Sequence, residues 1–170
     1  MSRLVHPPHR IGRERLAELV SSAAYGSILV LGALSVISVS EVAGGHAAEL
    51  VASVGLATWL AHLFAELLAD HVRHSEPLNR AEIRRAAMDG SPILLVTVVP
   101  AIMLLAGRLD VLSDSAARVV AILVAIVQLL AIGDYVARVA ATPPATRWSF
   151  AAVTGGLGIA MVVLTLLLGH

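Results

Sequence analysis

Five apolar stretches, each about as long as a membrane span, constrain the fold of this chain more than any other feature. They cover residues 16–40, 49–72, 91–107, 118–139 and 147–168. A helix needs about 20 mostly apolar residues to cross the hydrocarbon core of a bilayer. Of the 170 residues, 58% are hydrophobic and 14% are charged, which is unlike a soluble domain of ordinary composition. The sequence therefore predicts an all-α fold: a polytopic membrane helix bundle with five transmembrane helices, embedded in the lipid bilayer.

The polar segments between these stretches complete the expected organisation. Residues 1–15 form a polar arm, and residues 16–170 form a single transmembrane domain. No A-x-A cleavage site closes a short apolar segment near the start, so we expect the first span to stay in the mature protein. Residues 73–90 are the one substantial loop, in which Asn79 and Glu82 predict the capped start of a short helix over residues 80–88.

All 12 basic residues are arginines, and their distribution predicts the orientation. If the N-terminus is cytoplasmic, ten arginines lie inside and only Arg108 and Arg118 lie outside. Cytoplasmic loops of membrane proteins carry the excess of positive charge. We therefore expect a multi-pass protein of the cell (plasma) membrane, with the N-terminus in and the C-terminus out. The composition, rich in Ala, Val and Leu and without lysine, suits a GC-rich bacterial genome and hence a bacterial inner membrane.

Several function classes find no support in the composition. The formal net charge is zero, so there is no electrostatic argument for binding nucleic acid. The chain has no cysteine, which excludes disulfides and thiolate catalysis. No nucleophile stands at a plausible spacing from a base, and no glycine-rich loop could cradle a phosphate. We do not expect an enzyme.

A polar stripe in the second span is the main candidate for a functional site. His62, Glu66 and Asp70 follow one another at intervals of four residues, which places them on one face of a helix. Ionisable side chains inside a membrane segment are costly and by default mark a functional site. Glu66 lies about 6 Å deeper in the membrane than Asp70, because an α-helix rises about 1.5 Å per residue.

Other polar side chains are expected at the same depth, in the cytoplasmic halves of the first and fourth spans. Together with the stripe they predict a hydrated pocket open to the cytoplasm, whose ion-binding or proton-relay candidates are Glu66, His62, Asp70, Glu18, Tyr25, Ser22 and Asp134. Imidazole and carboxylate ligands suit Fe, Mn or Zn, so Glu66 and His62 are the candidate metal ligands. The metal would be a transported ion, because no resident cofactor is indicated.

Each of these residues also has a structural explanation. Glu66 would then accept a hydrogen bond from Ser21, Ser22 or Tyr25 and join two helices, as polar residues in membrane helices often do. His62 and Tyr25 would be packing residues. Asp70 would be a solvated helix end next to Arg73. Asp134 would pair with Arg138, and Glu18 with Arg15, as charged neighbours on one helix do.

The layout resembles the vacuolar iron transporter family of divalent-cation transporters. The similarity lies in five spans, in Ala65-Glu66 at the place of a Gly-Glu pair in the second span, and in a fifth span with Gly155 and Gly156. It implies a dimeric pore for a divalent cation, with Glu66 as a ligand. This chain has Tyr25-Gly26 where the family has an acidic residue before glycine, and it lacks the family's long acidic helices between spans two and three.

Two segments also resemble the bacterial relatives of the lysosomal potassium channel. They are Val20-Ser21-Ser22 in the first span and Trp59-Leu60-Ala61-His62 in the second. Those channels have six spans, whereas this chain has five apolar stretches.

Two functional hypotheses follow. The first is a homodimeric transporter or channel for a small, divalent cation, coupled to protons, with its site at Glu66 and His62. The second is a structural or accessory membrane subunit that transports nothing, whose polar stripe binds helices or a partner protein.

Overall fold

The structure is a computed structural model. It describes residues 8–74 and 79–140 and, beyond them, positions 143, 148–149, 152–153, 155–156, 158–160, 163 and 167. The described residues form helices and no strands. The helices are α1 (Pro8–Val36), α2 (Val39–Ala43), α3 (His46–His74), α4 (Arg80–Asp89), α5 (Ser91–Arg108) and α6 (Asp114–Val139). The expected all-α fold is confirmed.

Four of these helices are long and apolar enough to cross a membrane. The candidate spans are Gly12–Val36, His46–Arg73, Ser91–Arg108 and Asp114–Val139. They fall where the first four spans were expected, so the chain has the architecture of a multi-pass membrane protein. Half of the expected fifth span, residues 147–168, lies outside the described residues. The number of spans and the orientation therefore stay predictions.

The first long helix ends earlier than expected, at Val36 instead of residue 40. The cause is the start of a second helix, α2, within the apolar stretch. The Ser38 hydroxyl accepts a hydrogen bond from the Glu41 backbone N–H at 3.3 Å, and the Glu41 carboxylate accepts one from the Ser38 N–H at 2.7 Å. This reciprocal capping box begins α2, which occupies part of the expected turn.

Capping also fixes the helices on either side of α5. Asn79 accepts hydrogen bonds from the N–H groups of Ala81 and Glu82 at 2.9 and 3.0 Å, and the Glu82 carboxylate accepts one from the Asn79 N–H at 2.9 Å. The expected capped start of α4 is confirmed. The start of α6 was placed four residues too late, because Ser113 caps it by accepting a hydrogen bond from the Ala116 N–H at 3.4 Å.

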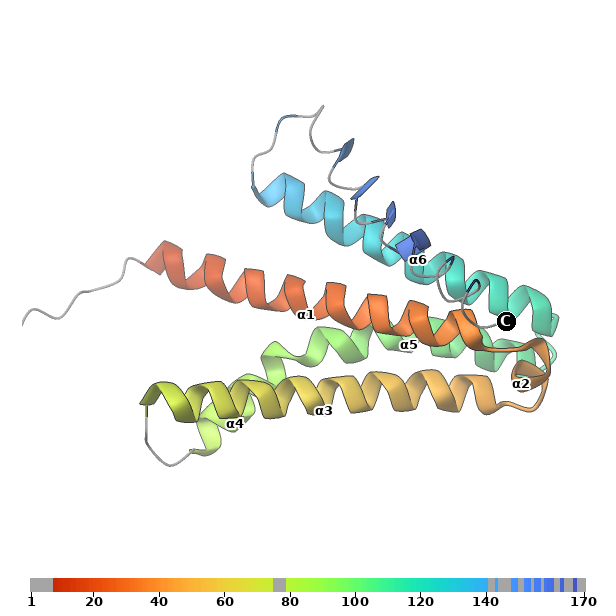
Figure 1. Cartoon of the computed structure of the whole chain (residues 1–170), viewed down its shortest axis with the longest axis horizontal. Coiled ribbons are helices and arrows are strands. Elements are labelled where there is room, and N and C mark those ends of the chain that lie inside the picture. The colour runs from red at the N-terminus through yellow and green to blue at the C-terminus, as the bar shows by residue number, and fades with distance from the viewer. Residues whose placement is uncertain are drawn as a thin grey trace, which may run out of the picture.

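The four long helices run alternately up and down (Figure 1). α1 and α3 lie side by side, and α5 packs against both. α6 packs against α1 and diverges from it toward the C-terminal end of α6. One end of the bundle contains the start of α1, the ends of α3 and α6, and the helix α4. We call it the arginine end. It holds Arg13, Arg15, Arg73, Arg80, Arg84, Arg85 and Arg138, whereas Arg108 and Arg118 lie at the opposite end.

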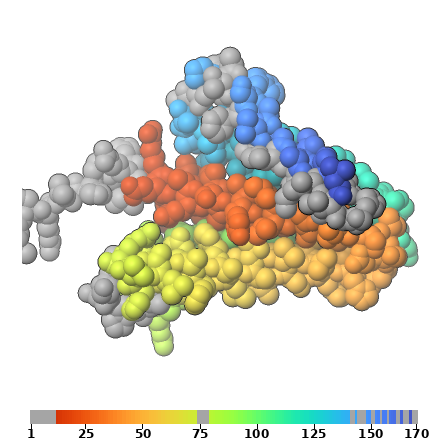
Figure 2. All heavy atoms as spheres, in the orientation of Figure 1, coloured from red at the N-terminus to blue at the C-terminus, as the bar shows by residue number. Residues whose placement is uncertain are grey.

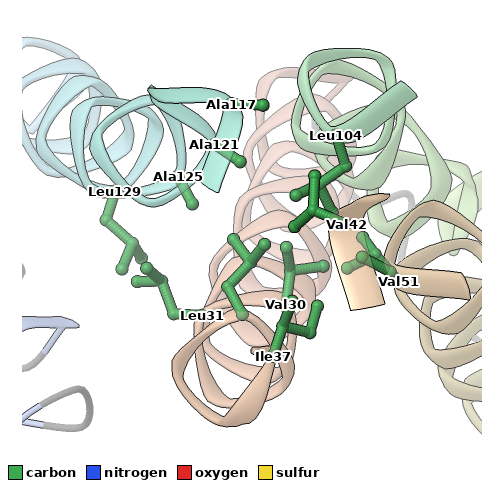
Figure 3. Close-up of a cluster of buried hydrophobic side chains, with 12 residues drawn as sticks. Val30, Leu31, Ile37, Val42, Val51, Leu104, Ala117, Ala121, Ala125 and Leu129 are labelled. Carbon is green, nitrogen blue, oxygen red and sulfur yellow. The ribbon is translucent and has the colours of Figure 1, made fainter. Parts of the chain in front are cut away.

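The apolar core fills the half of the bundle near the opposite end (Figure 3). Its largest members are Leu31 and Leu34 on α1 and Ile37 in the link that follows, and they pack with residues of α2, α3, α5 and α6. On α6 the buried residues Ala117, Ala121, Ala125 and Leu129 recur every four residues, which gives this helix one narrow packing face. The core therefore closes the opposite half of the bundle with apolar side chains.

The outer faces of the helices are apolar as well. Phe64 is 63% exposed on α3 and Leu95 67% exposed on α5. Such a surface suits contact with lipid and not with water.

Described residues of the C-terminal region lie along α6 and α1, in dark blue in Figure 2. Gly155 and Gly158 are buried there. A methyl group on Gly155 would collide with Leu130, and one on Gly158 would come within 2.9 Å of Leu129 and 3.1 Å of Leu31. Small residues allow such close approach between helices.

Candidate functional site: a carboxylate-lined cavity

A cavity of about 170 Å³ lies between α1, α3 and α4 at the arginine end. We call it the carboxylate cavity. Seven residues line it: Glu18 from α1, Glu66, Asp70 and Arg73 from α3, and Arg85, Ala86 and Asp89 from α4. Four carboxylates thus face two guanidinium groups. The spacing of Glu66, Asp70 and Arg73 along one face of α3 explains why one helix supplies three of the charged groups.

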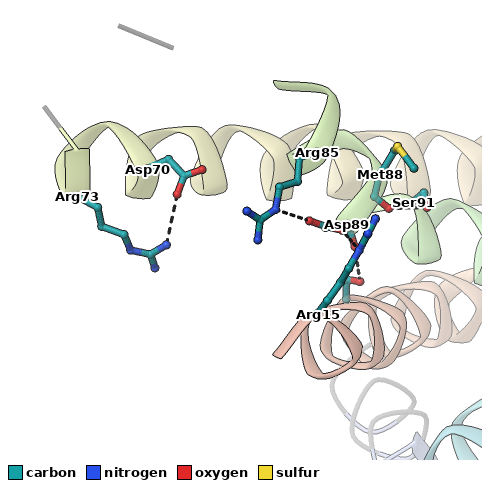
Figure 4. Close-up of polar contacts among 8 residues, drawn as sticks. Arg15, Asp70, Arg73, Arg85, Met88, Asp89 and Ser91 are labelled. Atoms are coloured by element: carbon teal, nitrogen blue, oxygen red, sulfur yellow. Dashed lines mark hydrogen bonds and ion pairs between the residues drawn. The ribbon is translucent and has the colours of Figure 1, made fainter. Parts of the chain in front are cut away.

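Asp89 is the best anchored of these carboxylates (Figure 4). Its side chain is 5% exposed and lies 3.2 Å from the Arg15 Nε and 3.5 Å from the Arg85 Nε. Its backbone carbonyl accepts a hydrogen bond from the Ser22 hydroxyl at 3.0 Å. Asp89 therefore ties α4 to α1. The sequence places it only before the third span, and its one local signal is the interval of four residues from Arg85.

These contacts correct two of the structural explanations. Arg15 pairs with Asp89 and not with Glu18. The Ser22 hydroxyl donates to the backbone carbonyls of Leu19 and Asp89 and not to Glu66.

Glu66 lies partly exposed on the wall of the carboxylate cavity. Among the described residues, no side chain or backbone group forms a hydrogen bond or an ion pair with its carboxylate. Glu18 is exposed and is equally unpaired within the described ranges. The cavity therefore contains two carboxylates whose charge is not matched by a direct partner.

Asp70 pairs with Arg73, as expected for the end of this helix. The Asp70 carboxylate lies 3.4 Å from the Arg73 Nη1, and the Arg73 side chain is 67% exposed. An ion pair that is open to solvent is worth about 1 kcal/mol or less. Asp70 thus adds negative charge to the cavity, and Arg73 offsets that charge.

His62 does not line the carboxylate cavity. Its ring lies against Gly90, where a methyl group would come within 2.9 Å of its Cδ2 and 3.2 Å of the Trp59 ring. The Trp59 Nε1 donates a hydrogen bond to the Ala87 carbonyl at 3.1 Å. The His62 Nε2 is buried and, within the described part of the chain, has no hydrogen-bond partner. His62 thus faces the junction of α4 and α5.

The structure therefore does not gather the expected metal ligands into one shell. Across residues 8–74, 79–140 and the scattered positions beyond, no group of three or more His, Asp or Glu side chains is placed to hold a metal ion. Binding of Fe, Mn or Zn at Glu66 and His62 stays a prediction.

The remaining candidate residues lie outside this cavity. Asp134 pairs with Arg138 on α6, with 2.6 Å between its Oδ2 and the Arg138 Nε, as the interval of four residues predicts. Tyr25 is 53% exposed. The fourth span does not contribute to the cavity as expected, because α6 diverges from the bundle at this end (Figure 1).

The comparisons with known proteins do not assign the chain to a group. No protein-family model matches it, no characterised protein matches its sequence, and no solved structure matches its fold. The resemblance to vacuolar iron transporters stays a prediction, and the carboxylate cavity is the feature of the molecule that bears on its function.

Proposed function

We propose that this integral membrane protein transports a small cation and that the carboxylate cavity is the binding site, with Glu66 as its principal ligand. The observation that carries the proposal is the Glu66 carboxylate. It faces the cavity without a hydrogen-bonding or charged partner among the described residues. A carboxylate in a partly desolvated membrane site has to pair, bind a cation or take up a proton.

The balance of charge in the cavity supports a cation over an anion. Arg73 is engaged by Asp70, and Arg85 by Asp89. Arg15 approaches Asp89 from α1 without lining the cavity. Glu18 and Glu66 are then left as the negative charges that attract a ligand. Two carboxylates on different helices can hold one cation between them, or share a proton as the cation enters and leaves.

The distribution of polar and apolar residues supports access from one side only. The carboxylate cavity lies at the arginine end, and the apolar core around Leu31, Leu34 and Leu104 closes the other half. A cation would therefore enter from the cytoplasm if the N-terminus is inside. Its release on the other side requires this core to open, or a pathway formed with a second subunit as in the proposed homodimer.

The proposal is tested by Glu66→Gln, which removes the charge and keeps the shape. Glu14→Gln is the matched control, because Glu14 is an exposed glutamate at the same end of α1 that does not line the cavity. Purified protein in liposomes would be assayed for Mn²⁺, Fe²⁺, Zn²⁺, Na⁺ and K⁺ flux. We expect flux of at least one cation with the native protein and with Glu14→Gln, and none above background with Glu66→Gln.

Thermal unfolding in detergent gives a second readout. A bound cation stabilises the native state by about 2.7 kcal/mol at 100 times its dissociation constant. We expect the transported cation to raise the melting temperature of the native protein and of Glu14→Gln but not of Glu66→Gln. Equal flux and equal cation stabilisation in all three proteins would refute the assignment.

A structural or accessory role is the second candidate, and the Asp89 contacts favour it. Asp89 joins α1 and α4 through Arg15, Arg85 and Ser22. In that case Asp89→Asn lowers the melting temperature or breaks an oligomer. Glu66→Gln then has no effect on flux or cation binding, because the native protein neither transports nor binds a cation.

A further inference from the structure

An apolar groove lies between α1 and α6. It is at the arginine end, where Figure 1 shows α6 diverging from α1. It consists of two adjoining hollows of about 440 and 360 Å³ that share Leu16, Val20 and Tyr135 in their walls. The groove lies on the side of α1 that Glu18 does not occupy. It is separate from the carboxylate cavity, and no residue lines both.

One positive charge stands at the end of this groove. Arg13 is exposed and is the only charged side chain among the residues that line the two hollows. It forms no ion pair within the described residues. The hydroxyl-bearing residues Ser21 and Tyr135 line the same hollow. The other lining residues of this hollow are apolar: Leu16, Ala17, Val20, Val136, Val139 and Ala140.

The length of the groove matches one leaflet of a bilayer. It extends along α1 from Arg13 to Ala23, which corresponds to about 15 Å at 1.5 Å per residue. Half of the hydrocarbon core is also about 15 Å thick. A cation at one end and an apolar channel of this length suit a molecule with an anionic head and a hydrocarbon chain.

We propose that the α1–α6 groove binds one anionic phospholipid of the membrane, with an acyl chain between the helices and the phosphate at Arg13. A guanidinium group can donate two parallel hydrogen bonds to a phosphate. The described residues Gly155 and Gly158 pack against Leu130 and Leu129 of α6, which do not line the two hollows. The proposal does not depend on cation transport.

The test is native mass spectrometry of the purified full-length protein, titrated with phosphatidylglycerol or with phosphatidylcholine of the same chain length. We expect the native protein to retain one phosphatidylglycerol and to bind phosphatidylcholine more weakly. Arg13→Gln should weaken phosphatidylglycerol binding about ten-fold, which corresponds to the loss of a charged hydrogen bond. The matched control is Arg84→Gln, because Arg84 is an exposed arginine at the same end that does not line the groove.

Ala23→Phe tests the apolar part, because the ring would take up space in the hollow that Ala23 lines and should weaken retention of the lipid. If that variant does not fold, Arg13→Gln against Arg84→Gln decides. Equal losses in the two arginine variants would show only general attraction to anionic lipid and would overturn the proposal. Ala23→Phe that keeps its lipid but changes from dimer to monomer would assign the groove to a second copy of the chain and overturn it as well.

Discussion

Asp89 is a buried carboxylate whose two cationic partners come from different helices and are largely in water. The side chains of Arg15 and Arg85 are 52% and 70% exposed, against 5% for Asp89. Removal of one arginine leaves the other to neutralise the carboxylate. Removal of both leaves a buried negative charge without compensation, which is the costly case.

We therefore predict a cooperative effect of the two arginines on stability. Arg15→Gln or Arg85→Gln alone should lower the free energy of unfolding by about 0.5–1 kcal/mol, because exposed partners are screened by solvent. The double variant should lose about 2–3 kcal/mol, more than the sum of the single losses. Denaturant unfolding of the four proteins in one detergent measures this double-mutant cycle. Strict additivity would show that Asp89 is already solvated through the carboxylate cavity.

Glu41 provides a pH-dependent contact at the opposite end of the bundle. The Ser38 hydroxyl and the Ser38 backbone N–H both donate to its carboxylate at 2.7 Å, and these hydrogen bonds lower the pKa of Glu41 below its ordinary value of 4.5. A lowered pKa in the native state means that the capping box contributes stability above pH 4.5 and loses it as the pH falls through the native pKa.

We expect Ser38→Ala to raise the Glu41 pKa toward its ordinary value, because the largest of the lowering contacts is removed. NMR titration of the side-chain carboxyl carbon, with Glu49 as an internal reference on α3, measures this change. An unchanged Glu41 pKa in Ser38→Ala would mean that the hydroxyl does not hold the carboxylate in solution.

At the scale of the helices, close packing depends on a few glycines. A methyl group on Gly26 of α1 would come within 3.0 Å of the Ile93 Cα of α5, which is backbone and cannot rotate away. Gly12 on the same helix has nothing within 4 Å of that position. These two positions form a matched pair for measuring how tightly α1 packs on α5.

We predict opposite effects of alanine at the two sites. Gly26→Ala should destabilise the protein by about 1–3 kcal/mol, because the helices must separate to accommodate the methyl group. Gly12→Ala should be neutral or stabilise by up to about 1 kcal/mol, since alanine is the better helix former. Melting temperatures in detergent compare them. A loss of similar size in both variants would indicate a helix effect and not a packing effect.

Local sequence rules predicted the helices better than the contacts between them. The apolar runs located four long helices, and Asn79 with Glu82 located α4. The break at Ser38 was missed because hydropathy alone continues the apolar run across it. The spacing of Ser38 and Glu41, which is that of a capping box, was the signal that could have located it. The pairing of Asp89 with Arg15 bridges 74 positions, and the divergence of α6 depends on helix crossing. Neither follows from a local pattern.

At the scale of the whole molecule, the number of spans decides on which side of the membrane residue 170 lies. The four described candidate spans return residue 140 to the arginine end, where α1 begins. A fifth span over residues 147–168 would carry the C-terminus across the membrane once more. The absence of cysteine makes single-cysteine variants clean reporters of this choice.

We predict that, in intact cells, a membrane-impermeant maleimide labels His170→Cys and Ser40→Cys and does not label Arg84→Cys. Ser40 lies at the opposite end and Arg84 on α4 at the arginine end, and both are exposed, so accessibility of the side chain does not limit the reaction. The arginine-rich end should face the cytoplasm, because positive charge opposes translocation. After permeabilisation all three variants should react.

Labelling of Ser40→Cys alone in intact cells would leave the C-terminus inside and the protein with four spans. Labelling of Arg84→Cys alone would reverse the orientation, so that the carboxylate cavity would open to the outside and would take up its cation there.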